Sequence, residues 1–447
     1  MRIVIVGGGQ IGHGLAKALS AGHEVFVIDH DPLVADVFQS MDVEFITGSG
    51  TNEDVLGRAD VANADFFVAA TGLDEVNIVA CAIASRLGRP QTVCLVSRSD
   101  FLDAEGGGTG LQPFGVDRGI WPEAQLAADI ERTVTAPGAI DAEVFAGGVV
   151  RLLEYRLDDE SSLTAAPVAR LRMPRGSLIV AVKRGVHISV PRGHTQLAQD
   201  DKIIIMGTPE AMAEVEALVN PQRTSERLVV TIIGGGDVGL QLARRLEAMP
   251  NCDLRVLERD PARGALLAAA LARTLVLNGD GTDLEFLESE DVGRSDVLVS
   301  VIDNDERNLL ASLLGRQLGV PKIITRVSRP SNLRLFERVG IDVAISARGA
   351  AVASILHQIT GGATSLLAVL EHGEARVFEF TLPAAFAARQ LKDIGTAEDA
   401  IVAAILHGDH AIVPRGDDRI GPGDRILVFC TRQAADRVRQ YFMDPAP

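Results

Sequence analysis

The chain has 447 residues, 47% of them hydrophobic and 23% charged, which argues against intrinsic disorder and indicates more than one folded domain. Its formal net charge of −17 counts against nucleic acid or an anionic lipid surface as a partner, because both attract basic proteins. The longest apolar run, residues 265–277, contains Arg273 and is shorter than the roughly 20 residues of a membrane helix, so we expect no direct membrane insertion.

The first part of the chain is typical of a parallel sheet covered by helices. Short aliphatic runs at residues 3–6, 24–28, 66–69 and 92–96 are separated by helical stretches that open on glycine or on an acid. This alternation predicts an α/β fold with a doubly wound, Rossmann-like domain. The N-terminus runs directly into the first strand, so we expect no signal peptide. The cysteines lack paired spacing and are expected to be buried and reduced: Cys81, Cys94, Cys252 and Cys430.

The residues that follow have a different character. Segments 177–182, 187–190 and 202–206 are short and β-rich, and a helix is predicted from Pro209. This pattern favours a small α+β domain after the Rossmann-like one.

The whole pattern then recurs. GGGQIG at residues 7–12 returns as GGGDVG at 234–239, and later motifs return in the same order, including VSR at 96–98 and 327–329. Such an ordered set indicates a tandem duplication. We therefore predict two Rossmann domains, at residues 1–134 and 228–357, each followed by a small domain, at 139–221 and 365–447. The polar segment 221–227 is the predicted hinge between the halves.

Each glycine motif follows a strand and opens a helix, which is the context of a dinucleotide-binding turn. In the first copy Gly7 allows the tight turn, Gly9 lets the backbone approach a pyrophosphate, and Gly12 permits close packing of strand and helix. The start of the following helix, at Gln10 and Ile11, offers amides and a positive dipole end to the phosphate. The equivalent residues of the second copy are Gly234, Gly236, Asp237, Val238 and Gly239.

An acid at the end of the second strand completes the pattern. Asp29 is placed to bind both ribose hydroxyls, and its neighbours His30 and Asp31 offer no arginine for a 2′-phosphate, which favours NAD over NADP. Glu258 has this position in the second copy, where the adjacent Arg259 makes the preference less clear. The alternative is that the glycines serve packing alone, in a fold that binds no nucleotide.

Further polar residues recur at strand ends, where open α/β sheets bind ligands. These candidate ligands are Thr51, Thr71, Asp74 and Arg98 in the first copy and Asp280 and Arg329 in the second. Asp74 with Asn77 could instead cap the following helix, and Arg98 could form a surface ion pair. Because Thr71 aligns with Ile302, the two sites are expected to be chemically unequal.

The sequence does not favour an enzyme. Hydride transfer to or from a nicotinamide needs a substrate domain with an acid or base, but the small domains lack clustered His, Lys, Tyr or Cys, and no metal-ligand spacing is present. An NAD-dependent oxidoreductase with a duplicated fold is the alternative that this reasoning leaves open.

The motifs together resemble those of the potassium-conductance regulator (RCK, or KTN) domain family. The resemblance rests on GGGQIG, the acid ending the second strand, GSGTNEDVL, VSRSDF and the later PRG and DDKIIIMG motifs, and it covers nearly the whole chain. The glycine-rich segment 104–110 departs from the family pattern, which puts any ligand contact there in doubt.

This resemblance implies a cytoplasmic regulatory subunit that acts beneath a membrane potassium channel or transporter. It implies a homotetramer with a ring of Rossmann domains that gates the pore, and NAD or NADH and ATP or ADP as ligands. The ligand residues it implies are Gly7, Gly9, Gly12, Asp29, Thr71 and Arg98, with Gly234, Gly236, Gly239, Glu258 and Arg329 in the second copy. The regulation of another cation transport or efflux system is the alternative within this class.

Overall fold

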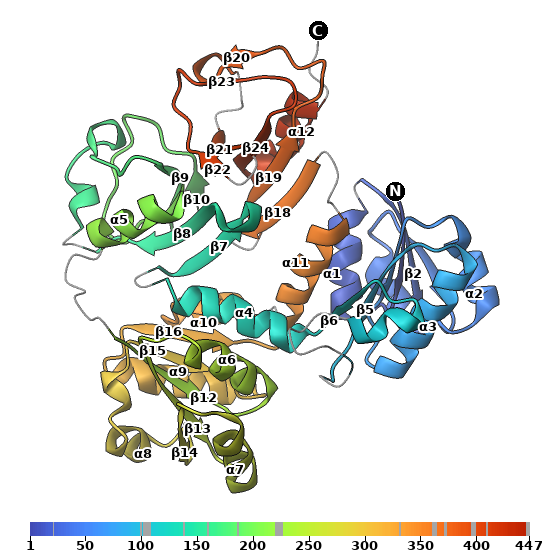
Figure 1. Ribbon diagram of the computed structural model, residues 1–447, viewed down its shortest axis with the longest axis horizontal. Helices are drawn as coiled ribbons and strands as arrows, with labels where there is room; N and C mark the ends of the chain where they lie inside the picture. The colour runs from blue at the N-terminus through green and yellow to red at the C-terminus, as the bar shows by residue number, and fades with distance from the viewer. Residues whose placement is uncertain are drawn as a thin grey trace. The chain divides into compact units, whose positions relative to one another are not determined.

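A computed structural model describes the chain except for residues 21, 99–100, 102–108, 137–138, 159–160, 186, 220–226, 330–331, 360–363, 371–372, 395–398, 408–409 and 444–447. The elements group into two compact units (Figure 1). One unit contains Met1–Glu131 and Arg227–Ile359, and the other contains Arg132–Glu226 and Thr360–Pro447. The two Rossmann domains therefore form one unit, and the two small domains form the other.

The first unit contains two six-stranded parallel sheets with the same topology. The first has the order β3-β2-β1-β4-β5-β6, and the second has the order β14-β13-β12-β15-β16-β17. In both, the chain leaves the central strand toward one edge and then returns to the other. This change of direction opens a crevice at the carboxyl ends of the two central strands, where doubly wound sheets bind ligands.

The first sheet is formed by β1 (Arg2–Val6), β2 (Glu24–Asp29), β3 (Glu44–Thr47), β4 (Phe66–Ala69), β5 (Gln91–Leu95) and β6 (Arg118–Ile120). Its helices are α1 (Gln10–Leu19), α2 (Glu53–Arg58), α3 (Asp74–Leu87) and α4 (Pro122–Val134). The strands are aliphatic and buried on both faces, as expected where helices cover both sides of a parallel sheet.

The second sheet is formed by β12 (Leu228–Ile233), β13 (Cys252–Glu258), β14 (Leu275–Asn278), β15 (Val297–Ser300), β16 (Lys322–Arg326) and β17 (Val343–Ile345). Its helices are α6 (Asp237–Glu247), α7 (Pro261–Ala270), α8 (Leu284–Ser289), α9 (Asp305–Gln317), α10 (Leu333–Arg338) and α11 (Ala347–Ile359).

The last helix of each Rossmann repeat packs on the other repeat. Ala351 and Ile355 of α11 are fully buried in one core with Leu15 of α1, and Figure 1 draws the two helices side by side. In the reciprocal arrangement, Glu131 of α4 accepts a hydrogen bond of 2.9 Å from Arg245 of α6. The two Rossmann domains are therefore linked by exchanged helices.

The second unit contains two five-stranded antiparallel sheets of equivalent strand order, β10-β9-β11-β8-β7 and β22-β21-β24-β19-β18, read from the same end. They share one apolar core, which includes Val180 and Met206 from the first repeat and Val377 and Phe429 from the second. Each small domain therefore covers an apolar face of the other.

The strands of the first small domain are β7 (Asp141–Phe145), β8 (Val150–Arg156), β9 (Ser177–Arg184), β10 (His187–Ser189) and β11 (Lys202–Gly207), followed by α5 (Pro209–Val219). Those of the second are β18 (Thr364–Leu370), β19 (Ala375–Thr381), β21 (Ala400–His407), β22 (His410–Ile412) and β24 (Arg425–Thr431), followed by α12 (Ala435–Met443), with β20 (Arg389–Gln390) and β23 (Arg419–Ile420) as a separate pair.

These elements confirm the predicted fold class, with its duplicated Rossmann-like sheets and small α+β domains. The four cysteines are buried and unpaired, as expected. Residues 221–226 of the predicted hinge and residues 104–108 of the glycine-rich segment lie outside the described residues. None of the described helices is long and apolar enough to span a bilayer.

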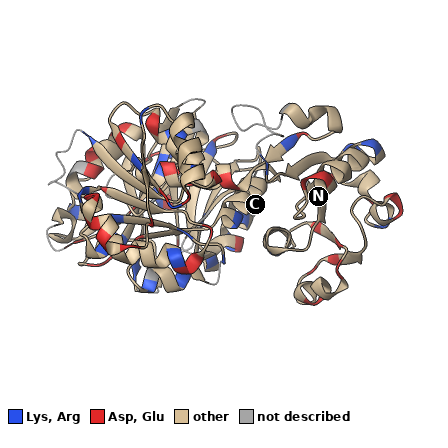
Figure 2. Cartoon of the chain, turned by 90° about the horizontal axis from the view of Figure 1, so that it is seen from below, with Lys and Arg blue, Asp and Glu red and all other residues tan. Residues whose placement is uncertain are grey.

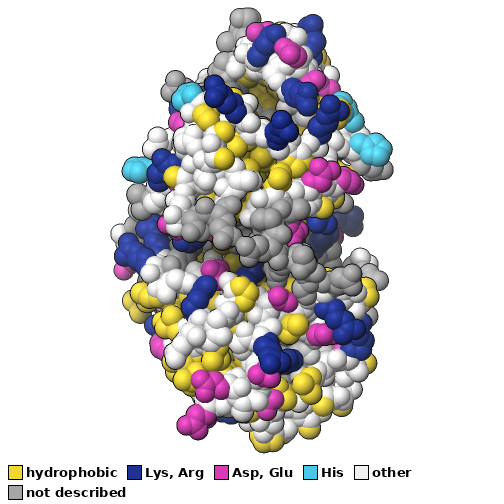
Figure 3. Space-filling view, turned by 90° about the vertical axis from the view of Figure 1, so that its left-hand side faces the viewer, with side chains coloured by type: hydrophobic (Ala, Val, Ile, Leu, Met, Phe, Trp, Pro, Cys, Tyr) yellow, Lys and Arg dark blue, Asp and Glu magenta, His cyan; other side chains and the backbone are white. Residues whose placement is uncertain are grey.

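Charges of both signs are interspersed over the surface. Figure 2 shows Lys and Arg alternating with Asp and Glu over many elements, and the face in Figure 3 carries both signs with hydrophobic side chains between them.

Candidate nucleotide-binding sites

The first glycine turn has the geometry that its sequence predicts. Gly7 has a φ of +104°, and a Cβ there would lie 2.6 Å from the carbonyl oxygen of Ala70. A Cβ at Gly12 would overlap the carbonyl oxygen of Gly7, whereas one at Gly9 would meet nothing within 4 Å. Gly7 and Gly12 are therefore required by the protein's own packing, and Gly9 faces open space.

The second turn repeats this division. Gly234 has a φ of +107°, a Cβ at Gly239 would overlap the carbonyl oxygen of Gly234, and one at Gly236 would meet nothing within 4 Å. In both copies, packing within the protein does not require the middle glycine, Gly9 or Gly236. This is the glycine where a pyrophosphate would approach the backbone.

The helices behind the turns have uncapped N-termini. Gly9 is the N-cap of α1 and Gly236 is the N-cap of α6, and neither has a side chain that could accept from the first-turn amides. Helix N-termini carry unpaired N–H groups and a partial positive charge, which an anion can satisfy. Gln10 and Ile11 lie in the first turn of α1, and Asp237 and Val238 occupy the same positions in α6.

The acids at the ends of β2 and β13 hold the glycine turns. The Asp29 carboxylate accepts from the amide of Gly8 at 2.6 Å and from that of Asp31 at 2.9 Å. Glu258 accepts in the same way from Gly235 at 2.7 Å and from Asp260 at 2.8 Å. Each acid therefore lies next to the turn, at the place predicted for ribose recognition.

Asp74 lies against the loop that follows β5. Its buried carboxylate accepts from the amides of Ser97 at 2.8 Å and Arg98 at 3.2 Å. The N-cap of α3 is Leu73, and no side-chain hydrogen bond caps it, so the capping alternative for Asp74 is wrong. Asp74 instead fixes the backbone that carries Arg98.

Asp305 has the equivalent role in the second repeat, where it accepts from the amides of Ser328 and Arg329 and from the side chain of Asn332. Burial raises the pKa of Asp305, but these hydrogen bonds outweigh it and hold the pKa below its ordinary value. The carboxylate therefore stays ionised and keeps Arg329 at the strand end.

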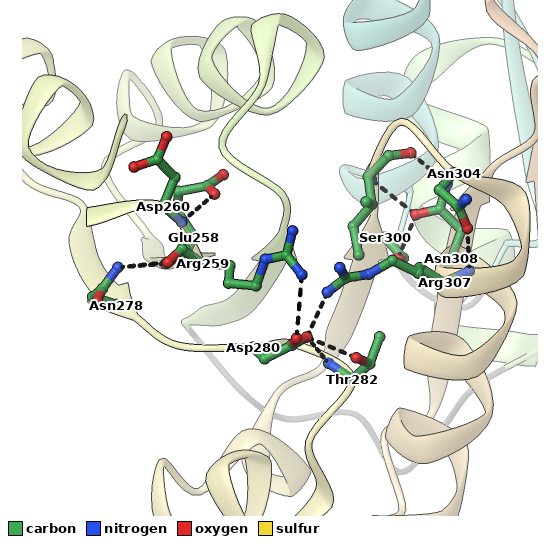
Figure 4. Close-up of polar contacts among 11 residues, drawn as sticks. Glu258, Arg259, Asp260, Asn278, Asp280, Thr282, Ser300, Asn304, Arg307 and Asn308 are labelled. Carbon is green, nitrogen blue, oxygen red and sulfur yellow. Dashed lines mark hydrogen bonds and ion pairs between the residues drawn. The ribbon is translucent and has the colours of Figure 1, made fainter. Parts of the chain in front are cut away.

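A buried asparagine joins the ends of the two strands beside each crevice. Asn77 accepts from the amide and the hydroxyl of Thr71, at 2.9 and 2.6 Å, and donates to the carbonyl of Leu95 at 2.9 Å. Asn308 does the same in the second repeat, but there the hydroxyl comes from Ser300 (Figure 4). The Thr71 hydroxyl is thus engaged with Asn77, and in the second repeat Ser300, two residues before Ile302, supplies the equivalent hydroxyl.

Two of the remaining candidates in the first site lie at its edge. The Thr51 hydroxyl is 2.8 Å from that of Ser49 in the loop after β3. Arg98 is exposed, with its guanidinium 5.1 Å from the ring centre of Phe101 and 4.0 Å from the Glu75 carboxylate. A contact of 4.0 Å between exposed groups is a weak ion pair.

The second site contains an arginine that the sequence analysis missed, Arg307, beside the Arg259 that it named. Asp280 accepts from Arg307 at 2.6 Å and from the hydroxyl of Thr282 at 2.7 Å, and it lies 3.9 Å from Arg259 (Figure 4). Burial raises the pKa of Asp280, but these hydrogen bonds and the charge of Arg307 together lower it. The ion pairs are therefore formed at neutral pH.

Arg263 adds a further cation at the glycine turn. It donates to the carbonyl of Gly235 at 2.7 Å and to Asp237 at 3.0 Å. The residues at the equivalent positions of the first repeat carry no arginine, since Val34 replaces Arg263 and Val76 replaces Arg307. These substitutions were visible in the aligned repeats, and that comparison is the signal that could have found them.

Comparison with known proteins agrees with the duplicated organisation. The TrkA-N domain model matches residues 3–117 and 230–347, and the TrkA-C domain model matches residues 152–220 and 377–443. Among solved structures, the chain is similar in fold to the GsuK RCK domain, with a TM-score of 0.59 at 19% identity over 99% of this chain and 94% of that one. It is also similar to the GsuK channel bound to NAD, with a TM-score of 0.59 at 20% identity over 98% of this chain and 78% of that one.

Relatives of known name match along their whole length. The chain is 37% identical to the Trk system potassium uptake protein TrkA homolog 1 of Methanosarcina mazei, over 99% of this chain and 100% of the relative. It is 33% identical to the TrkA homolog of Archaeoglobus fulgidus at the same coverage, and 28% identical to TrkA of Haemophilus influenzae over 96% of this chain and 95% of that one. The chain therefore belongs to the TrkA family of Trk system potassium uptake proteins, with TrkA-N and TrkA-C domains in tandem.

Proposed function

We propose that the chain is the nucleotide-sensing regulatory subunit of a membrane potassium uptake system. The observation that carries this proposal is the pair of uncapped helix N-termini, each behind a glycine turn whose middle glycine faces open space. Such a turn provides unpaired amides for a pyrophosphate, and the acid beside it provides acceptors for a ribose. The family relationship supplies the potassium transport context.

The two sites bind different nucleotides in this proposal. The first site, where His30 and Asp31 rather than an arginine follow Asp29, suits NAD or NADH. The second site, with Arg259 and Arg307 at Asp280 and Arg263 at Asp237, suits a nucleotide of higher phosphate charge such as ATP or ADP. The Nε of Arg307 is buried without a hydrogen-bond partner among the described residues, so this side chain has a donor to spare.

The chain acts as a homotetramer in this proposal. Val79 on α3 and Leu310 on α9 are equivalent positions of the two repeats, and each is 46% exposed. Exposed apolar surface marks interfaces where it forms a patch, and in this proposal another copy of the chain covers these matched positions. The assembled ring would act at the inner face of the membrane, through contact with the pore-forming subunit.

The proposal is a binding function rather than catalysis, and one titration series tests both statements. ADP, ATP, NAD and NADH are titrated into the full chain by calorimetry, and the absorbance of NADH at its nicotinamide band is followed with a panel of small carbonyl substrates. We expect saturable binding and a constant absorbance. Turnover of NADH, or the absence of binding by every nucleotide, would contradict the proposal.

A further inference from the structure

The exchanged helix α11 brings an arginine of the second repeat to the first glycine turn. The guanidinium of Arg348, the second residue of α11, donates to the side-chain oxygen of Gln10, the first residue of α1, and lies 3.2 Å from the carbonyl of Ser328. Gln10 directly follows Gly9, the glycine that faces open space. Arg348 is therefore at the edge of the place proposed for the pyrophosphate.

The packing beneath fixes this arginine in position. A Cβ added at Gly14 would lie 3.1 Å from Val352, and this pair has the same separation along the chain as Gln10 and Arg348. The helices α1 and α11 therefore run in the same direction with their N-termini together. The positive ends of both helix dipoles meet at the first site, where they favour an anion.

The equivalent residue in the reciprocal arrangement has the opposite charge. Glu123 is the second residue of α4, and its electrostatic neighbours include Asp237, at the start of α6, and Arg326. The first site thus receives a cation from the other repeat, and the second site receives an acid. The exchanged helices therefore add a difference in charge between the two sites.

We propose that Arg348 binds a phosphate of the nucleotide in the first site, so that the second repeat completes the site of the first. This inference rests on the proposed nucleotide binding. Arg348 is exposed and its present partners are neutral oxygens, whereas a guanidinium forms shorter and stronger hydrogen bonds with a phosphate. Nucleotide binding then ties α11, which follows the last strand of the second sheet, to α1 of the first repeat. Occupancy of the first site is in this way transmitted to the second Rossmann domain.

The test uses the full chain with Gly236→Val, which fills the open space at the second turn so that binding reports on the first site. ADP-ribose and adenosine are titrated into this parent and into the same chain with Arg348→Ala. We expect Arg348→Ala to weaken ADP-ribose at least tenfold, as the loss of a charged hydrogen bond does, and to change adenosine less than twofold. Arg348→Lys should recover part of the loss, and Glu123→Ala, the matched change on α4, should change neither affinity.

Equal binding of ADP-ribose by the parent and Arg348→Ala would overturn the inference, and so would equal losses for ADP-ribose and adenosine, because both show that the side chain does not bind a phosphate. Failure of the parent to bind either compound would instead contradict the proposed function of the first site. The unfolding midpoint of each variant is measured alongside, and we expect no change for the exposed Arg348.

Discussion

The residues beside two equivalent carboxylates distinguish the candidate sites. Asp29 and Glu258 hold their glycine turns by the same pair of backbone hydrogen bonds, but Asp29 has His30 beside it and Glu258 has Arg259. An arginine can donate to nucleotide oxygens and so supply affinity that does not depend on the acid. The two acids should therefore differ in how much nucleotide affinity depends on them.

Replacement of each acid by alanine tests this difference. Asp29→Ala should weaken NADH by about ten- to a hundredfold, since hydrogen bonds to a charged group are typically strong, and Glu258→Ala should weaken it less. NADH fluorescence titration measures both. Equal losses for the two variants would contradict the claim that the sites are unequal.

The arginines of the second site have their own test. Arg307→Ala removes a cation that Asp280 holds in place, so we expect ATP to bind about tenfold more weakly at the second site and NADH at the first site to be unaffected. Calorimetry with ATP in a Gly9→Val background isolates the second site, and NADH binding to the first site is measured in the Gly236→Val background. Unchanged ATP affinity would show that Arg307 serves only the ion pair with Asp280.

Glu123 gives a pH-dependent prediction. Burial, and the nearby Asp237 and Asp303, raise the pKa of Glu123, although Arg326 opposes them, and its Oε2 is buried without a hydrogen-bond partner among the described residues. When folding raises the pKa of a carboxyl, the protonated group stabilises the folded state fully at pH values below its unfolded-state pKa. This stabilisation is lost as the pH rises through the folded-state pKa. At neutral pH the ionised Glu123 therefore destabilises the fold.

Glu123→Gln should accordingly stabilise the chain at pH 7, by about 1 kcal/mol, and the gain should disappear below about pH 4, where the wild-type acid is protonated. Thermal unfolding across this range is the measurement. Glu131→Gln on the same helix is the control, and it should give no gain because Glu131 is paired with Arg245. A gain that persists at low pH would mean that the charge is not its cause.

At the scale of elements, the glycine turns were predictable from the sequence because their requirement is local. After a strand, the turn needs a positive φ at its first glycine, an uncapped helix start at its second and a close approach of helix to strand at its third. These requirements give the glycines a fixed spacing. The bounds of β1 and β4 and the start of α5 were likewise close to prediction, since aliphatic runs and the start of a helical pattern mark them.

Other elements differ between repeats that look alike. Residues Pro32–Phe38 form a 3-10 helix where the second repeat has the α-helix α7. The second copy is rich in Ala and Leu, which favour an α-helix, whereas the first copy has Val and Asp there. The exchange of α4 and α11 was not predicted, because their amphipathic pattern shows that a face is buried but not which repeat buries it.

Different glycines of the turn should matter for stability and for nucleotide binding. Gly12→Ala should destabilise the chain by several kcal/mol, because its Cβ would overlap the Gly7 carbonyl, whereas Gly9→Ala should leave the unfolding midpoint nearly unchanged and weaken nucleotide binding. Thermal unfolding and titration of both variants check this. Normal nucleotide affinity in Gly9→Ala would contradict the placement of the pyrophosphate.

At the scale of the whole molecule, duplication gives one chain two candidate sites with different surroundings. The repeats told us that like domains exist, but the grouping into one unit of Rossmann domains and one of small domains depends on contacts between residues far apart in the sequence. Such contacts are set by side-chain packing across repeats, which periodicity along the chain does not report.

The proposed assembly predicts a change of mass in solution. Val79→Arg combined with Leu310→Arg places charges on exposed apolar positions of equivalent helices, so we expect tetramers to dissociate while each chain stays folded. Sedimentation velocity measures the mass, and the control is Leu33→Arg, an exposed leucine elsewhere on the first repeat. A tetramer that survives the paired change would place the interface on other surfaces.

The central claim is that nucleotides bound by this chain control potassium uptake by a membrane partner. The most direct measurement is potassium flux into vesicles that contain the pore-forming subunit, with the purified chain added and ADP, ATP or NADH varied. We expect the flux to depend on both the chain and the nucleotide. We also expect Asp29→Ala and Glu258→Ala each to remove part of the nucleotide response. Flux that is the same with and without nucleotide, at concentrations that saturate both sites, would contradict it.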